Sequence, residues 1–217
     1  MNCSIIAISR TLGAGGEDLG SRLASALGWK YVDSEIIDRA AELAGASPQE
    51  LSRVEERKGL VARILENMAR VGAGSMAIGG APEPIAVMLE AGPTYEQLIV
   101  DVIKEVAEQG EVVIVAHGAS IPLAGTMGLI RVLVTASTKA RINRVAGDQK
   151  VLPSKASELV ANSDKSRADY FRRFYNLDHE GPTNYDLVIN TDVLRVEEAS
   201  AAVLAIAQRI PAIQPGR

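Results

Sequence analysis

Apolar and amphipathic segments alternate along the chain in a pattern that predicts an α/β fold. Short runs of mostly branched apolar residues have the length of buried strands, and the longer segments between them carry apolar residues at helical spacing. Strands buried on both faces and joined by helices are typical of a parallel sheet with right-handed crossovers. We therefore expect a three-layer α/β/α fold around a five-stranded parallel sheet. The strands are expected at residues 5–8, 30–32, 112–115, 130–134 and 187–189.

Helix signals fill the intervals between these strands. In the first interval, Leu19, Leu23 and Leu27 recur every four residues, and Gly28 can end the helix. Ser34 can cap the next helix, because a serine side chain accepts a hydrogen bond from the free amides of the first turn. Helices are expected at residues 17–28, 35–45, from 47 onward, 96–109, after the fourth strand and at about 196–209.

A glycine-rich turn follows the first strand directly. In the segment SIIAISRTLGAGGEDLG the strand leads through Gly13 and Gly15 into a helix. Backbone N–H groups at such a junction converge at the positive end of a helix dipole and form an anion site suited to phosphate. The usual phosphate loop, G-x-x-x-x-G-K-[ST], has a lysine and a hydroxyl residue where this chain has Gly16, Glu17 and Asp18. The chain keeps the cradle and lacks its lysine.

The composition limits the size of the fold and the class of partner. The chain has 217 residues, enough for one α/β domain with an appendage or for two small domains. Hydrophobic residues make up 47% of it and aromatic residues only 4%, so we expect a core of alanine, valine, isoleucine and leucine. The net charge of −4 argues against a nucleic-acid polymer or a membrane surface as the partner.

Cysteine usage and the lack of targeting signals predict the compartment. The single cysteine, Cys3, excludes an internal disulfide and is typical of a reducing environment. The N-terminus lacks the regions of a signal peptide, and no apolar run reaches the roughly 18 residues that a membrane span needs. We therefore expect a cytoplasmic protein that binds a small molecule.

Two stretches break the alternation of strands and helices. Residues 59–95 are rich in glycine and methionine and poor in charge, which is typical of a lid or of an interface with a second copy of the chain, although an ordinary loop insertion has the same composition. Residues 139–175 hold nine basic and four acidic residues, a charge of +5 in a chain whose remainder is therefore −9. A basic segment on an acidic body suits a small ligand rich in phosphate. We expect a mobile lid at about 149–165.

Arginines in the basic segment are candidates for the missing cation. Phosphoryl transfer needs cations and N–H donors around oxygens that gain charge, and the planar guanidinium group binds phosphate through two hydrogen bonds. Arg141 and Arg144 share one face of a helix, and Arg167 lies on a later helix. If both helices fold over residues 11–17, these side chains can replace the absent lysine. The alternative interpretation is a solvated basic helix face.

A dinucleotide site is a rival interpretation of the same loop. Gly13 and Gly15 follow a strand, and Asp33 stands twenty residues further on at the end of the second strand. This arrangement partly matches the G-x-G-x-x-G fingerprint of NAD-binding Rossmann-like proteins. The third glycine is replaced by Asp18, whose charge would repel a pyrophosphate. An NAD-binding function therefore stays open only as an alternative.

The segment IAISRTLGAGGEDLGSRLASALGWKYVDSEIIDRA resembles the opening of bacterial cytidylate kinases. It is still more similar to the cytidylate kinase-like group, whose openings run like SREYGSGGREIG and also lack the loop lysine. The resemblance covers nearly the whole chain, more weakly over residues 59–95. It continues in VVIVAHGAS, IRVLVTASTKARINRV, DKSRADYFRRFY and NYDLVINTD.

The resemblance implies a binding site for ATP and one for an acceptor monophosphate. Ser34 and Arg39 match residues that hold the acceptor phosphate, and Asp33 opens the same turn. His117 stands where the group has an arginine, and a neutral or half-charged imidazole is a poorer anion ligand. Arg141 and Arg144 match arginines at the lid entrance, and Arg167 matches one in the helix that returns from it. The implied ATP-phosphate site consists of Gly13, Ala14, Gly15, Gly16, Glu17 and Asp18.

The resemblance also implies Mg²⁺ as a cofactor. Glu17 or Asp18 could hold the ion directly, since carboxylates suit magnesium, or both could simply stabilise the helix N-terminus through its dipole. We expect one domain over residues 1–217, with a core at 1–58 and 96–210 and an acceptor-side insert at 59–95.

The expected fold is the P-loop NTPase-like fold of nucleoside monophosphate kinases. The expected function is ATP-dependent phosphorylation of a small phosphorylated acceptor, with cytidine monophosphate as the acceptor that the resemblance implies. The alternative is a catalytically weak or inactive nucleotide-binding or sensor protein, whose loop has lost its lysine.

Overall fold

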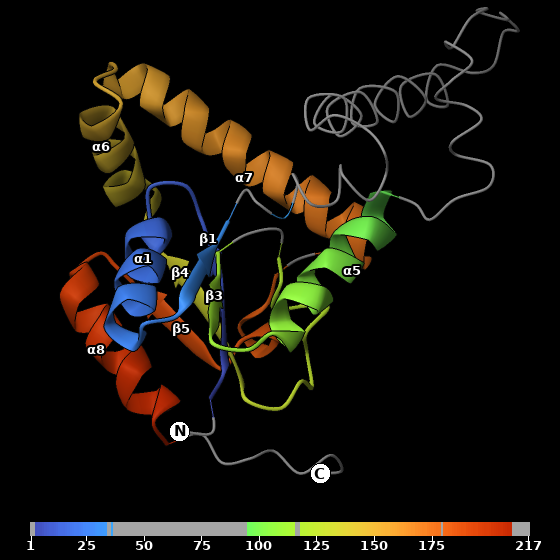
Figure 1. Ribbon diagram of the computed structural model, residues 1–217. Helices are drawn as coiled ribbons and strands as arrows, with labels where there is room; N and C mark the ends of the chain where they lie inside the picture. Colours follow the sequence, from blue (N-terminus) through green and yellow to red (C-terminus); the bar gives the residue numbers. More distant parts are fainter. Residues whose placement is uncertain (1–2, 34–35, 37–94, 116–117, 179, 210–217) are drawn as a thin grey trace, which may run out of the picture. The chain divides into compact units, whose positions relative to one another are not determined.

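The computed structural model describes residues 3–33, 36, 95–115, 118–178 and 180–209 (Figure 1). The chain divides into two compact units, one formed by Met1–Asp33 with Ile103–Arg217 and the other by Ser34–Val102. The first unit contains the whole sheet. The helices expected at 35–45 and from 47 onward and the insert at 59–95 lie outside the described residues. The expected division into core, insert and lid stays a prediction.

The first unit contains the predicted five-stranded parallel sheet, with strand order β2-β3-β1-β4-β5 (Figure 1). The expected strands are all present, and their ends differ from the expected ones by at most two residues. This order differs from the 3-2-1-4-5-6 order of classic dinucleotide-binding sheets. The strands are β1 Ile5–Arg10, β2 Lys30–Val32, β3 Val112–Ile114, β4 Leu129–Thr135 and β5 Leu187–Asn190.

Strand β1 lies in the middle of the sheet and delivers the glycine loop to its carboxyl edge. Ile5 pairs with Val112 on one side and with Leu129 on the other. Because both neighbours and both faces cover it, the first five residues of β1 are buried, which explains its apolar run. Arg10, the last residue of β1, pairs with Val134.

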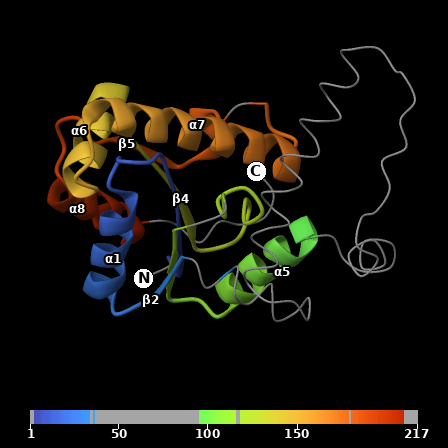
Figure 2. The same ribbon diagram turned by 90° about the horizontal axis from the view of Figure 1, so that it is seen from above.

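The helices cover the sheet and its carboxyl edge. Helices α1 and α8 lie side by side on one face (Figures 1 and 2). Helices α6 and α7 lie beyond the carboxyl ends of the strands and pack on each other through Val145, Ala156 and Val160 (Figure 1). The helices are α1 Gly16–Leu27, α5 Tyr95–Glu108, α6 Thr138–Asp148, α7 Pro153–Tyr175 and α8 Val196–Ala207.

Close packing of α1 on the sheet fixes the start of this helix. A Cβ atom on Gly20 would lie 2.4 Å from Cγ2 of Val115, the residue after β3, so the helix approaches the end of this strand as closely as a glycine allows. The three-layer arrangement agrees with the prediction from the sequence. None of the helices within the described ranges is both long and apolar enough to cross a membrane.

Candidate functional site

The loop between β1 and α1 has the backbone shape of an anion cradle. Gly13 and Gly15 have φ angles of 79° and 81°, in the left-handed region that favours glycine. Gly15 is also the N-cap of α1, and no side chain caps the helix there. Inside the loop, the N–H of Ala14 donates to the carbonyl of Thr11 at 3.0 Å. The loop therefore ends at an uncapped helix N-terminus.

Side chains from other elements hold the loop carbonyls. Nη1 of Arg144 donates to the Gly13 carbonyl at 3.1 Å, and Oγ1 of Thr191 donates to the Ala14 carbonyl at 2.9 Å. In a trans peptide the N–H points opposite to the preceding C=O, so the N–H of Gly15 faces away from the side on which Thr191 holds the Ala14 carbonyl. Within the described ranges, no acceptor is found for the N–H groups of Gly13 and Gly15. These amides and those of the first turn of α1 are free to bind an anion.

Thr191 contacts the loop and was missed by the sequence analysis. It is only 4% exposed and follows β5 directly. Its Oγ1 also accepts a hydrogen bond from Nη1 of Arg144 at 2.9 Å, and its carbonyl accepts one from Nη2 of the same arginine. The contact with Ala14 joins residues 177 positions apart, so no local pattern could reveal it.

Replacing Thr191 with valine is expected to lower the free energy of unfolding by about 1–3 kcal/mol, because a buried carbonyl and a guanidinium group lose a partner. Thermal denaturation measures this loss. The control is Thr183→Val at an exposed position before β5, for which we expect a change within about 0.5 kcal/mol. Equal melting temperatures for the two variants would show that Thr191 does not hold the loop.

Two predicted arginines, Arg141 and Arg144, come from α6 and do reach the loop. Arg141 is 5% exposed, and its guanidinium forms a bidentate pair with Asp164 of α7, at 2.8 and 2.7 Å. Its Nη1 also lies 3.4 Å from the carbonyl of Leu12. Both arginines thus contact the carbonyl side of the loop, while the free amides lie on the other side. Both terminal nitrogens of Arg144 donate to oxygens of Gly13 and Thr191.

The third predicted arginine, Arg167, lies on α7 and is tied to the end of β1. Its Nε and Nη2 donate to the two carboxylate oxygens of Glu180 at 2.8 and 2.7 Å. Nη2 also donates to Oγ of Ser9 at 2.6 Å, and the guanidinium lies 4.7 Å from the ring centre of Phe171. Ser9 and Glu180 were missed by the sequence analysis because they are 171 residues apart.

Arg141 and Arg167 line the same cavity. Its volume is about 270 Å³, and it lies between the glycine loop, α7 and the segment that follows α7. A phosphate group binds guanidinium in the same bidentate way as a carboxylate does, so it would compete with the acidic partners of both arginines. The lining residues are Thr11, Arg141, Asp164, Arg167, Ala168, Phe171, Leu177, Asp178 and Glu180.

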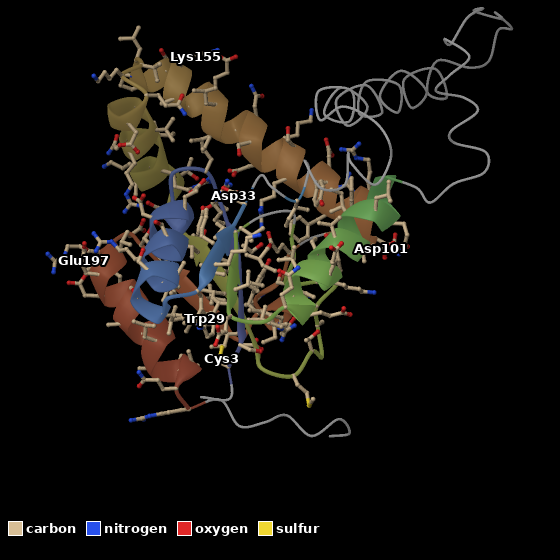
Figure 3. The ribbon with its side chains drawn as sticks, in the orientation of Figure 1. Cys3, Trp29, Asp33, Asp101, Lys155 and Glu197 are labelled. Atoms are coloured by element: carbon tan, nitrogen blue, oxygen red, sulfur yellow. The ribbon has the colours of Figure 1, made fainter. Side chains whose placement is uncertain are left out.

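A second group of charges lies where α1 begins and β2 ends. Nε of Arg10 lies 2.5 Å from Oε1 of Glu17, and Oη of Tyr31 donates to Oδ2 of Asp33 at 3.4 Å. Burial, together with the carboxylates of Asp33 and Glu17, raises the pKa of Tyr31 to about 12, so this phenol stays neutral at physiological pH. Figure 3 shows Asp33 at the carboxyl end of the sheet and Cys3 at the opposite end.

The other predicted site residues are only partly accounted for. Ser34, Arg39 and His117 lie outside the described residues, so their roles stay predictions. Among the residues that the structure describes, no three acidic, histidine or cysteine side chains gather as a metal site. The assignment of magnesium to Glu17 or Asp18 is likewise still a prediction.

Comparison with known proteins places these features in a family context. A family model described as the cytidylate kinase-like family matches residues 5–193. The cytidylate kinase of Methanoculleus marisnigri is 25% identical over 52% of this chain, and the match spans 62% of that protein, less than two thirds of its length. The cytidylate kinase of Natronomonas pharaonis is 23% identical over 92% of this chain and 86% of that protein.

Solved structures show the same fold. An uncharacterized protein from Eubacterium ventriosum superimposes with a TM-score of 0.66 at 18% identity, covering 95% of this chain and 99% of that one. A shikimate kinase from Bacteroides thetaiotaomicron superimposes with a TM-score of 0.52 at 16% identity, covering 94% of this chain and 98% of that one. At these identities the likeness concerns the fold alone.

Proposed function

Because the chain belongs to the cytidylate kinase-like family, we propose that it transfers the terminal phosphoryl group of ATP to a small phosphorylated acceptor. The observation that carries this proposal is the cradle of free amides at the start of α1, whose loop carbonyls are held by Arg144 and Thr191. Both curated relatives named above are cytidylate kinases, so cytidine monophosphate is the first acceptor to test.

The amides of the glycine loop would hold the donor phosphates. Phosphoryl transfer depends mainly on position and on electrostatic stabilisation of the oxygens that gain charge. Amide dipoles fixed by Thr191 and Arg144 provide this stabilisation without reorganising during the reaction. An acceptor phosphate is already an anion, so no side chain is needed as a general base.

The carboxylates next to the loop fit a magnesium nucleotide. Mg²⁺ is usually held by one or two carboxylates together with substrate phosphates. Glu17 is paired with Arg10, whereas Asp18 is exposed in the first turn of α1 and is the better placed of the two predicted ligands. When bound, the ion would neutralise phosphate charge.

Arg141 and Arg167 would exchange their carboxylate partners for phosphate oxygens. Asp164 and Glu180 hold the two guanidinium groups in the cavity beside the loop. A bidentate phosphate contact preserves the geometry of each pair while it places positive charge on the transferring group. Arg144 then acts as a positioning residue for the loop, and Ser34 and Arg39 would bind the acceptor phosphate.

Calorimetric titration and a coupled phosphorylation assay test this function together. We expect the protein to bind Mg²⁺-ATP and a nucleoside monophosphate and to form a nucleoside diphosphate. Binding of both ligands without turnover would instead support a nucleotide sensor, the candidate favoured by Gly16 at the lysine position. A protein that binds no nucleotide would contradict both functions.

Replacing Arg39 with alanine is expected to weaken acceptor binding by about 10- to 100-fold and to leave ATP binding nearly unchanged, because a guanidinium–phosphate contact is lost at one subsite only. Titration with each ligand measures the two effects. The control is Arg22→Ala, which removes an exposed arginine of α1 that pairs with Glu197. Equal losses for both ligands in the Arg39 variant would refute the acceptor assignment.

A further inference from the structure

Two positions of the phosphate-loop pattern have exchanged their residue types in this chain. The pattern G-x-x-x-x-G-K-[ST] sets a glycine six positions before the lysine. Aligned on Gly15, the first glycine of the pattern falls on Arg10 and the lysine falls on Gly16. The chain therefore has a cation where the pattern has a glycine, and a glycine where the pattern has a cation.

The structure gives a steric reason for this exchange. A Cβ atom on Gly16 would lie 2.5 Å from Cβ of Arg10, 3.0 Å from its Cγ and 3.1 Å from its Cδ. Real Cβ atoms essentially never approach another heavy atom within 3.0 Å. The aliphatic stem of Arg10 thus fills the space where a side chain at position 16 would begin. With the backbone as it stands, only one of the two positions can carry a side chain.

The charge of Arg10 lies beside the first turn of α1. Its Nε lies 2.5 Å from Oε1 of Glu17, a residue of the first turn of α1, and the two side chains are 31% and 44% exposed. The Nε of Arg10 is buried and makes no hydrogen bond despite this close contact, and within the described part of the chain no hydrogen bond is found from its terminal nitrogens Nη1 and Nη2 either. The guanidinium groups of Arg141, Arg144 and Arg167, in contrast, donate through their terminal nitrogens to protein oxygens.

We infer that Arg10 supplies the cation that lysine supplies in the usual phosphate loop. Its terminal nitrogens bind the phosphate oxygens of the nucleotide, and Glu17 orients the guanidinium when no nucleotide is bound. Arginine suits this role because it never loses its charge and binds phosphate with a fork of two donors. The inference rests on the proposed function. It means that the phosphate loop of this chain keeps a cation, at position 10 instead of position 16.

The first test is the affinity of Arg10 variants for Mg²⁺-ATP and for inorganic tripolyphosphate, measured by calorimetry. We expect Arg10→Ala to weaken the affinity for both probes by about 10- to 100-fold, because one charge-assisted phosphate contact is lost. Arg10→Lys is expected to recover part of this affinity. Arg22→Ala is the control and is expected to bind as tightly as the unmodified protein, since Arg22 pairs with Glu197.

A purely structural role of Arg10 would be the neutralisation of Glu17. In that case Arg10→Ala combined with Glu17→Ala would restore the affinity, whereas a phosphate contact predicts that the double variant stays at least about 10-fold weaker. Restored affinity in this double variant, or unchanged affinity in Arg10→Ala, would overturn the inference. If the unmodified protein binds neither probe, the proposed function itself fails, which is a distinguishable result.

The second test moves the cation back to its usual position. Gly16→Lys alone is expected to lower the melting temperature, because its Cβ meets that of Arg10. Arg10→Gly alone is expected to bind ATP as weakly as Arg10→Ala. Combining Arg10→Gly with Gly16→Lys removes the clash and restores a cation, so we expect affinity at least 10-fold above that of Arg10→Gly, roughly the contribution of one charged contact. A folded double variant that binds ATP no more tightly than Arg10→Gly would count against the inference. If the double variant does not fold, the affinities of Arg10→Ala and Arg10→Lys decide.

Discussion

Replacing Arg167 with methionine is expected to slow phosphoryl transfer by about 10²- to 10³-fold, the usual loss when one donor to a developing charge is removed. The side chain lies in the cavity beside the loop and is bound through both sides of its fork by Glu180 and Ser9. In the proposed reaction it exchanges Glu180 for phosphate, so its loss removes charge from the transferring group. The measurement is the turnover number in the coupled assay, with folding checked by thermal denaturation.

Two control variants separate this role from a structural one. Arg172 lies on the same helix, and its side chain is 58% exposed. We expect the Arg172→Met variant to keep full activity. Glu180→Gln keeps Arg167 and removes the charge of its partner, so turnover should stay within about tenfold of that of the unmodified protein. If Glu180→Gln loses as much activity as Arg167→Met, the pair only holds α7 against β1, and Arg167 does not bind phosphate.

The second large effect is expected at Gly13, where alanine should destabilise the protein by about 2–4 kcal/mol. A Cβ atom there would lie 2.8 Å from the Arg141 carbonyl and 3.0 Å from Cγ2 of Val145, both in α6. The left-handed φ of 79° contributes ~1–2 kcal/mol of this loss, as for any residue with a Cβ. For a chain of this size the melting temperature should fall by about 5–15 °C, and nucleotide binding should weaken with it because the cradle is displaced.

Gly28→Ala is the matched control for Gly13→Ala. Gly28 has a similar φ of 69°, but no heavy atom lies within 4 Å of the place that an alanine Cβ would take, so only the backbone cost of about 1–2 kcal/mol remains. It also ends α1 at the opposite end from the loop, so nucleotide binding should not change. Equal melting temperatures for the two variants would show that α6 does not press on the loop.

Local patterns were sufficient to predict the sheet and the loop. The inner strands could be located because they are short apolar runs, mostly buried between neighbours, as in β1 and β3. The edge strands β2 and β5 are only partly buried, and their short apolar runs still marked them. The glycine loop could be located because left-handed backbone at Gly13 and Gly15 requires that residue type. Arg141, Arg144 and Arg167 were identified from charge and spacing, and all three lie against the loop or the end of β1.

The partners of these arginines could not be predicted from the sequence. Asp164, Glu180, Ser9 and Thr191 are ordinary polar residues whose importance comes only from what the fold places beside them. Arg10 was overlooked for the same reason. Only the structure shows that its side chain fills the space that a Cβ atom on Gly16 would occupy.

The sequence by itself determined the strands, the helices within the described residues and the cradle of amides, because the periodicity and backbone preferences that specify them act over a few neighbouring residues. The tertiary structure alone decided which cation faces which oxygen. Those contacts join residues such as Ser9 and Glu180, 171 positions apart, and they form only when parallel strands bring their carboxyl ends to one edge. Distance along the chain carries no information about such contacts, whereas the packing of α6 and α7 on that edge fixes them.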